Sequence, residues 1–173
     1  MSSVHVRFSA LIRAILFIIL LVPAISQAQG LSDFNGNPRS LDEFTGKGKW
    51  VVVMIWAHNY PLCNEEVQKF DIFHADHEER DAMVVGVSID GGYHDQKARE
   101  FIERHELGFP NLIGDARSVA RLHLDLSGQR LVGTPTFLLF APTGELVGMQ
   151  VGPLEPETIE AFMVKNANHP ASS

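Results

Sequence analysis

The order of apolar and polar segments along this 173-residue chain predicts an α/β fold, with a central mixed, mostly parallel β-sheet and helices on both of its faces. Residues 50–56 and 83–89 are continuous apolar runs without turn residues, which is typical of strands buried on both faces. A segment with helical spacing of apolar residues follows each run. The last third of the chain predicts a β-hairpin and a helix, which add an antiparallel edge to the sheet.

Two short features are expected before the first long strand. Asn35-Gly36 lies in a turn-rich stretch and is a strong hairpin signal. Residues 40–44 predict one helical turn, in which Ser40 is the N-cap and Glu43 completes a capping box.

A long helix is expected after the first strand, from Pro61 to about Glu79. Proline suits the first turn of a helix, where its missing N–H is no loss. Val67, Phe70 and Phe73 follow at spacings of three and therefore share one side of this helix.

The middle of the chain predicts a second strand at 83–89, which the turn residues at 90–92 end. A polar-rich helix with a few apolar positions is expected at 95–106. A short strand at 111–113 and a short helix at 116–122 follow.

The closing hairpin is predicted from two strands, 136–140 and 146–151, joined by a tight turn at 142–145. A final helix is expected at 155–165, because its first turn carries glutamates that interact favourably with the helix dipole. Residues 166–173 are expected to be frayed.

The N-terminus has the pattern of a secretory signal peptide. Arg7 and Arg13 form a positive region, an apolar run of twelve residues covers 14–25, and small residues at 26–28 offer a cleavage site. Twelve apolar residues are fewer than the roughly 20 that span a bilayer. We therefore predict a signal peptide at 1–28 and one domain at 29–173, with an uncleaved N-terminal membrane anchor as the alternative.

Charge and cysteine content exclude several classes of function. Two of the 14 basic residues and none of the 21 acidic residues precede residue 29, so the mature chain has a formal net charge of −9. Such a charge argues against nucleic acid or an anionic membrane surface as the main partner. The chain has one cysteine, so no disulfide forms within it.

Four segments in this order resemble the thioredoxin fold, and most closely the exported TlpA/ResA-type thiol:disulfide oxidoreductases. The resemblance covers about residues 31–164. It rests on the turn and helical segment at 33–44, on Trp56-Ala57-x-x-x-Pro61-x-Cys63, on the strand Val85-Gly86-Val87-Ser88-Ile89-Asp90, and on Gly133-Thr134-Pro135-Thr136-Phe137.

The resemblance implies a site in which one of two family cysteines is replaced. Tyr60 occupies the position of the nucleophilic cysteine, and Cys63 occupies that of the resolving cysteine. Trp56 belongs to the same motif as part of the expected substrate-binding site. Thr134, before a family cis-proline at Pro135, is expected to present its backbone to an extended peptide.

Cys63 has two interpretations. At a helix N-terminus it is placed for thiolate formation, as a monothiol that forms a mixed disulfide or sulfenic acid. Alternatively it is a small buried residue. Glu66 shares its helical face, and the family resemblance implies that this carboxylate handles protons; a solvated acid is the alternative. Tyr60 either fills the old substrate groove or packs at the surface.

Metal and cofactor sites are not predicted. His58 adjoins Cys63, but one cysteine and one histidine do not make a complete metal site. His74 and His77 have chelating i, i+3 spacing on the long helix, although such polar faces are usually solvated.

Three functions remain open. The first is an exported protein of the thiol:disulfide oxidoreductase family that acts through Cys63. The second is a non-catalytic module that binds client segments beside Pro135. The third is a one-cysteine peroxidase, although the Pro-x-x-x-Thr/Ser-x-x-Cys motif of peroxiredoxins has its first two positions replaced by Trp56 and Tyr60.

The expected partners are protein thiols or extended polypeptide segments, and not nucleic acid. A dimer linked through Cys63 is a further possibility, and membrane contact is expected only if the N-terminal segment is uncleaved. We predict that the protein is periplasmic or otherwise exported, because of its signal pattern.

Overall fold

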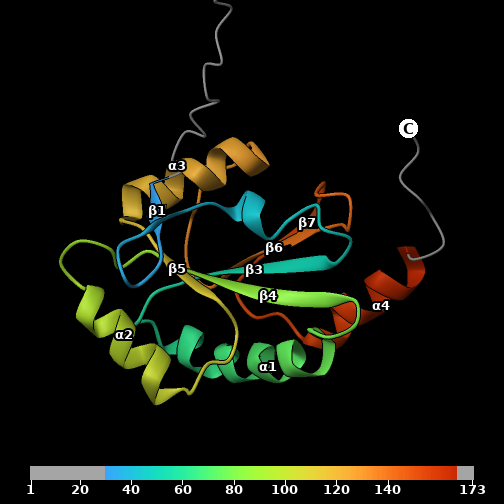
Figure 1. Cartoon of the computed structure of the whole chain (residues 1–173), viewed down its shortest axis with the longest axis horizontal. Helices are drawn as coiled ribbons and strands as arrows, with labels where there is room; N and C mark the ends of the chain where they lie inside the picture. The colour runs from blue at the N-terminus through green and yellow to red at the C-terminus, as the bar shows by residue number, and fades with distance from the viewer. Residues whose placement is uncertain (1–29, 167–173) are drawn as a thin grey trace, which may run out of the picture.

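The computed structural model describes residues 30–166 and confirms the predicted α/β class (Figure 1). Its sheet has seven strands in the order β2-β1-β5-β4-β3-β6-β7 within this described part. The strands are β1 (Leu31–Ser32), β2 (Pro38–Arg39), β3 (Trp50–Trp56), β4 (Ala82–Ser88), β5 (Asn111–Ile113), β6 (Thr136–Phe140) and β7 (Leu146–Val151).

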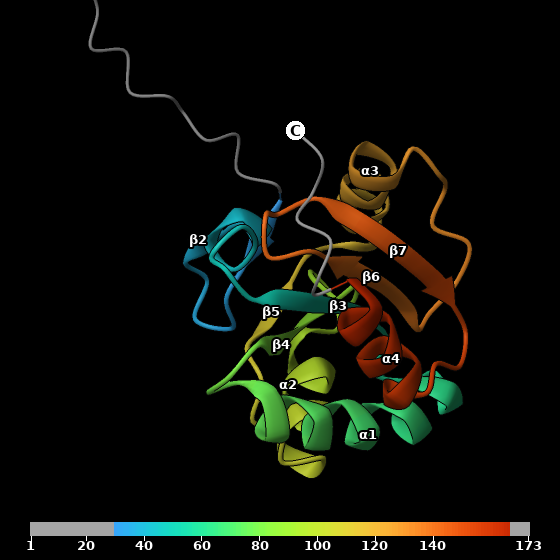
Figure 2. The ribbon, with the colours of Figure 1, turned by 90° about the vertical axis from the view of Figure 1, so that its right-hand side faces the viewer.

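Helices cover both faces of the sheet, as predicted. Figure 1 shows α3 on one side of the sheet and α1 and α2 on the other, and Figure 2 shows α4 packed on the same side as α1. The helices are α1 (Pro61–His77), α2 (Asp95–Arg104), α3 (Ala116–Ser127) and α4 (Pro156–Asn166), with a 3₁₀ turn, η1 (Leu41–Glu43), on the α3 side.

The sheet is mixed, with its parallel part at the centre. Strands β3, β4 and β5 pair in parallel, whereas the β1–β2, β1–β5, β3–β6 and β6–β7 pairs are antiparallel. The N-terminal hairpin contributes two of these antiparallel pairs, which the sequence indicated only through its turn signal. The carboxyl ends of β3 and β4 therefore lie side by side, at the edge where the candidate site is built.

Strand β3 lies at the centre of two cores because all of its side chains are buried. Met54 and Trp56 face α1, α2 and α4, whereas Val53 and Ile55 face α3. This alternation explains the continuous apolar run in the sequence: successive side chains enter opposite cores, and neither face of the strand meets solvent.

Helix α3 is longer than predicted. The helix continues past Leu122 to Ser127: Leu126 packs on the same core as Val119 and Leu122, and His123 is buried with its Nδ1 2.9 Å from the Gln129 carbonyl oxygen. Gly128, with a φ of 70°, ends the helix in the left-handed conformation.

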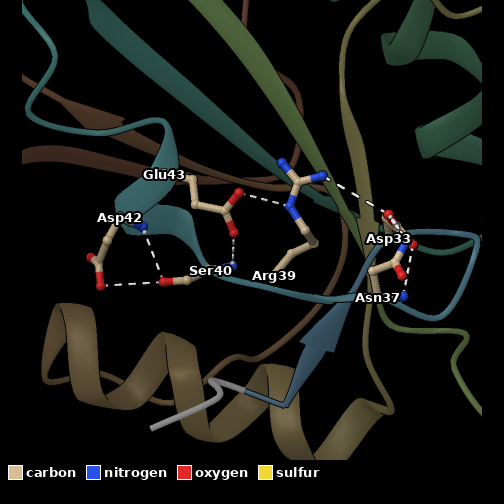
Figure 3. A network of polar contacts seen from close by, with 6 residues as sticks. All are labelled: Asp33, Asn37, Arg39, Ser40, Asp42 and Glu43. Carbon is tan, nitrogen blue, oxygen red and sulfur yellow. Dashed lines mark hydrogen bonds and ion pairs between the residues drawn. The ribbon is translucent and has the colours of Figure 1, made fainter. Parts of the chain in front are cut away.

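The N-terminal hairpin is fixed by a polar network (Figure 3). The Arg39 guanidinium donates to Glu43 at 2.7 Å and lies 4.0 Å from Asp33. Ser40 and Glu43 form the predicted capping box. Hydrogen bonds from Asn37 to Asp33, and from the Ser40 backbone to Glu43, lower the pKa of both carboxyls.

None of the described helices is both long enough and apolar enough to cross a membrane. The predicted signal peptide lies outside the described residues.

Candidate functional site

The turn after β3 is held by the loop after β4. Asp90 accepts hydrogen bonds from the His58 backbone N–H at 2.8 Å and from the Ser88 hydroxyl at 2.8 Å, and the same carboxylate contacts His58 Nδ1 at 2.8 Å. Asp90 is itself buried. A single buried carboxylate thus fixes the chain between β3 and α1.

Helix α1 then begins directly at the predicted motif. Tyr60 is its N-cap residue, with an extended backbone and no side-chain cap, and Pro61 takes the first helical position. The Cys63 N–H donates to the Tyr60 carbonyl at 3.0 Å. Cys63 therefore lies in the first turn of α1, as the sequence indicated.

The Cys63 thiol is inaccessible, with 0% of the residue exposed. Burial is the main cause that raises its pKa, and the charges of Asp90 and Glu66 raise it further. Hydrogen bonding with the Ala57 backbone and the Thr134 side chain opposes these effects but does not reverse them. The accessible, acidic thiol that the monothiol hypothesis requires is not present in this structure.

Thr134 lies against this cysteine, and the peptide bond between Thr134 and Pro135 is cis. Pro135 is buried, whereas Thr134 is half-buried. Among the described residues, the backbone N–H and C=O of Thr134 have no hydrogen-bond partner. Thr134 thus turns its side chain toward the thiol and leaves its main chain open to a further strand.

Tyr60 remains at the surface, 47% exposed. Trp56, by contrast, is fully buried: its ring stacks on Phe101 at 4.4 Å, and its Nε1 donates to Asn111 Oδ1 at 3.1 Å. The sequence predicted Trp56 to be part of the substrate-binding site, whereas β3 delivers this side chain into the core under α2.

Glu66 is buried rather than solvated, with 3% of the residue exposed. One of its oxygens accepts from Lys69 Nζ at 3.0 Å, and the other accepts from the Leu154 backbone N–H at 3.0 Å. It therefore anchors the segment before α4, and its charge disfavours a Cys63 thiolate.

His74 and His77 do not form a chelating pair or a solvated face. Both are buried, and each ring has its own protein partners: His74 Nδ1 accepts from the Val84 N–H at 3.1 Å, and His77 lies between Asp81 and Glu160. In the described residues, no group of three or more His, Cys, Asp and Glu side chains is arranged to hold a metal ion.

Sequence reasoning missed Asp90 and Ser88 as parts of the site. In the sequence analysis both residues belong to a strand segment of the family resemblance, and no role in the site was given to either. The signal was available, because carboxyl ends of adjacent parallel strands meet at one edge, which brings a residue after β4 next to the turn after β3.

Comparison with known proteins places this geometry in a family. The model of the AhpC/TSA family matches residues 22–149 of the chain. The chain belongs to the AhpC/TSA family. The narrower TlpA/ResA type stays a prediction from the sequence motifs.

Solved structures of thiol-disulfide oxidoreductases share the fold of this AhpC/TSA family member. The thioredoxin domain of an oxidoreductase from Bacteroides vulgatus superimposes with a TM-score of 0.61 at 24% identity, covering 75% of this chain and 89% of that one. A secreted disulfide oxidoreductase from Mycobacterium tuberculosis gives a TM-score of 0.61 at 17% identity, covering 81% and 98%. At these identities the likeness establishes the thioredoxin-like fold.

Among curated proteins, alkyl hydroperoxide reductase C of Mycobacterium tuberculosis is 30% identical over 94 residues, which cover 53% of this chain and 48% of the relative. The chain thus spans about half the length of the curated relatives it matches.

Proposed function

We propose that this AhpC/TSA family member is an exported, non-catalytic binding module that holds extended polypeptide segments beside Thr134 and Pro135. The observation that carries the proposal is the contrast at Cys63: the thiol is sealed from solvent with a raised pKa, while Thr134, which contacts it, leaves its backbone N–H and C=O unpaired among the described residues.

The chemistry of Cys63 disfavours catalysis. A reactive cysteine needs a thiolate in an electropositive, partly exposed setting. The charges of Asp90 and Glu66 both act on the Cys63 thiol. Both are negative, and both disfavour its thiolate. The prediction that the protein acts as a monothiol through Cys63 is therefore the weaker account.

The surface beside the thiol suits a polypeptide partner. Thr134 offers an unpaired N–H and C=O, the groups through which an extended segment adds to a protein backbone. Two exposed apolar side chains belong to the same segments of the chain: Tyr60 is three residues before Cys63, and Val132, which is 77% exposed, is two residues before Thr134. Such side chains supply contacts that do not depend on the sequence of the partner.

Export remains part of this proposal. It is supported by the signal-peptide pattern of residues 1–28 and by the family resemblance to exported TlpA/ResA-type proteins.

Fluorescence anisotropy with a cysteine-free, fluorescein-labelled peptide of alternating valine, threonine and lysine tests the binding proposal. We expect binding that Cys63→Ser leaves within about twofold of the unsubstituted protein, because the thiol does not contact the peptide. Val132→Asp is expected to weaken binding at least fivefold, since it replaces an exposed apolar side chain two residues before Thr134 by a charge.

The matched control is Val164→Asp, which introduces the same charge at a comparably exposed valine on α4. Equal losses in the two valine variants, or a loss of binding in Cys63→Ser, would overturn the proposal. A peptide containing a cysteine disulfide that becomes covalently attached to Cys63 would instead support the monothiol account.

A one-cysteine peroxidase is the second candidate, because the similar curated relatives are alkyl hydroperoxide reductases. In that reaction the Cys63 thiolate would attack the O–O bond of a peroxide, yielding sulfenic acid and an alcohol or water. Dimedone labelling after addition of hydrogen peroxide tests it. Stoichiometric labelling of the folded protein at micromolar peroxide would favour the peroxidase over the binding module.

A further inference from the structure

Two imidazole rings meet above the buried carboxylate of the site. His58, in the turn after β3, and His94, the residue before α2, have ring centres 5.5 Å apart. Metal–nitrogen bonds to imidazole are about 2.0–2.1 Å long, and each ring centre lies roughly 1.2 Å beyond its nitrogen, so two imidazoles on one ion have ring centres roughly 4.5 to 6.4 Å apart, depending on the angle at the metal. The observed separation lies within that range.

Asp90 positions both residues. Its carboxylate contacts His58 Nδ1 at 2.8 Å, and its backbone carbonyl accepts from the His94 N–H at 3.2 Å. The Ser88 hydroxyl and the His58 backbone N–H donate to the same carboxylate, which is therefore fixed in place. Each histidine is therefore held in position by a contact with Asp90.

A histidine held by a carboxylate through one ring nitrogen is the arrangement that supports metal ligands in proteins. Within the described residues, His58 Nε2 and both ring nitrogens of His94 have no hydrogen-bond partner. His94 is exposed and His58 is half-buried, so an ion can reach both from solvent.

We propose that His58 and His94 form a two-imidazole site for Cu²⁺, with water completing the coordination. No third protein ligand is assigned, which agrees with the absence of a larger ligand group in the described part of the chain. Cys63 is sealed from solvent, which removes the thiolate that would select zinc or Cu⁺. Nitrogen and oxygen donors alone suit Cu²⁺, which also binds most tightly among the divalent first-row metals.

Electron paramagnetic resonance of the full chain with one equivalent of CuCl₂ tests this site, with Cu²⁺ as the only added ligand. The expected spectrum is tetragonal, with nitrogen hyperfine splitting from two imidazoles. His94→Gln is the main variant, because an exposed side chain can be replaced without affecting folding. We expect it and His58→Gln each to weaken Cu²⁺ affinity at least tenfold and to remove one nitrogen from the spectrum.

His105→Gln is the matched control, since the His105 ring is half-buried and its Nε2 is already in contact with Asn64 at 3.0 Å. Circular dichroism of every variant establishes that it is folded. An unchanged Cu²⁺ affinity in His94→Gln, or an equal loss in His105→Gln, would overturn the proposal. The peptide-binding assay described above is metal-free, so either proposal can fail without the other.

Discussion

Cys63 is subject to opposing influences within a few ångströms. Its place in the first turn of α1 favours a thiolate through the helix dipole, an effect of roughly 0.3–1 kcal/mol at exposed sites. Complete burial and two nearby carboxylates disfavour the thiolate, and the raised pKa shows that they prevail. Position on a helix is thus a poor guide to reactivity when the side chain is sealed from water.

The burial and raised pKa of Cys63 predict a thiol that reacts slowly. Alkylation of Cys63 by iodoacetamide in the folded protein is expected to be at least tenfold slower at pH 8 than in the urea-unfolded chain, since both access and thiolate fraction are reduced. The measurement is the rate of modification against pH, followed by mass spectrometry. A fast reaction with a midpoint below about 8.5 would contradict the assignment of a structural thiol.

The residue scale is also where sequence-based prediction was least complete. The motif predicted that α1 begins at Pro61, with Tyr60 before it and Cys63 in its first turn, because proline and helix spacing are local signals. The burial of Cys63, Glu66 and Trp56 depends on α2, the segment before α4 and the Thr134 loop, which are remote in sequence. No periodicity around the motif contains that information.

At the scale of elements, Gly86 on β4 leaves space for a side-chain hydrogen bond that connects β3 with β5 across β4. Trp56 at the end of β3 donates to Asn111 on β5, and the Asn111 side chain passes over Gly86 of β4. A Cβ atom at Gly86 would lie 2.0 Å from Asn111 Oδ1 and 2.9 Å from the Phe109 ring. Only glycine leaves room for this connection.

We therefore predict that Gly86→Ala lowers the free energy of unfolding by about 2–6 kcal/mol. Crowding in a packed core costs about 1–3 kcal/mol, and an unpaired Trp56 N–H costs about 1–3 kcal/mol. Urea unfolding followed by circular dichroism measures the change.

Gly148→Ala is the matched control for the Gly86 prediction. A Cβ atom there would meet Leu139 at an ordinary 3.5 Å. The free energy of unfolding is expected to stay unchanged or to rise by up to about 1 kcal/mol. A Gly86 variant as stable as this control would show that Asn111 moves aside without cost.

The junction of α1 and β4 depends on a neutral imidazole. His74 Nδ1 accepts from the Val84 N–H, and Nε2 lies 3.0 Å from Glu78, so the ring is fully paired while uncharged. Burial is the main cause that lowers the pKa of His74 below its usual value of 6.5. The unfolded chain consequently takes up this proton at a higher pH than the folded protein does.

The stability linked to neutral His74 is complete above pH 6.5 and is lost as the pH falls through the lowered pKa of the folded protein. We expect His74→Gln, whose amide oxygen still accepts from Val84, to show a smaller fall in unfolding free energy between pH 7.5 and pH 5. Urea midpoints across this range measure it, and His94→Gln controls for the loss of a histidine.

Element types were predictable because their signals are local and repeated. The apolar runs, the Pro61 start and the capping box at Ser40 all appear in the structure at the expected places. The end of α3 was not predicted, since His123 is a polar residue that becomes buried through its contact with Gln129. The residue that marks the end of α3 in the sequence is Gly128, one residue beyond the helix.

At the scale of the whole molecule, the chain shares a thioredoxin-like fold with thiol-disulfide oxidoreductases but has a single cysteine. The thioredoxin-like framework is intact around the site, including the Thr134–Pro135 segment that lies against Cys63. From the sequence resemblance we predict that the second sulfur atom of a dithiol would lie at the N-cap of α1, where Tyr60 stands. If the framework alone positions that sulfur, a single substitution should create the missing chemistry.

Tyr60→Cys tests this directly. We expect the variant to form a disulfide between residue 60 and Cys63 under oxidising conditions, because the N-cap residue and Cys63 are already joined by a 3.0 Å backbone hydrogen bond across one helical turn. Thiol titration should then find no free thiol in the oxidised variant and two after reduction. The reduced variant is also expected to reduce insulin disulfides, since an exposed cysteine attacks and the buried one resolves the mixed disulfide.

Two controls separate this outcome from a general effect of replacing tyrosine. Tyr60→Ser should keep one unreactive thiol and show no insulin reduction. Tyr60→Cys combined with Cys63→Ser should form mixed disulfides that are not resolved, because the second sulfur is absent. Two free thiols in oxidised Tyr60→Cys would show that residue 60 does not occupy the nucleophile position, and the correspondence between this site and a dithiol centre would then be wrong.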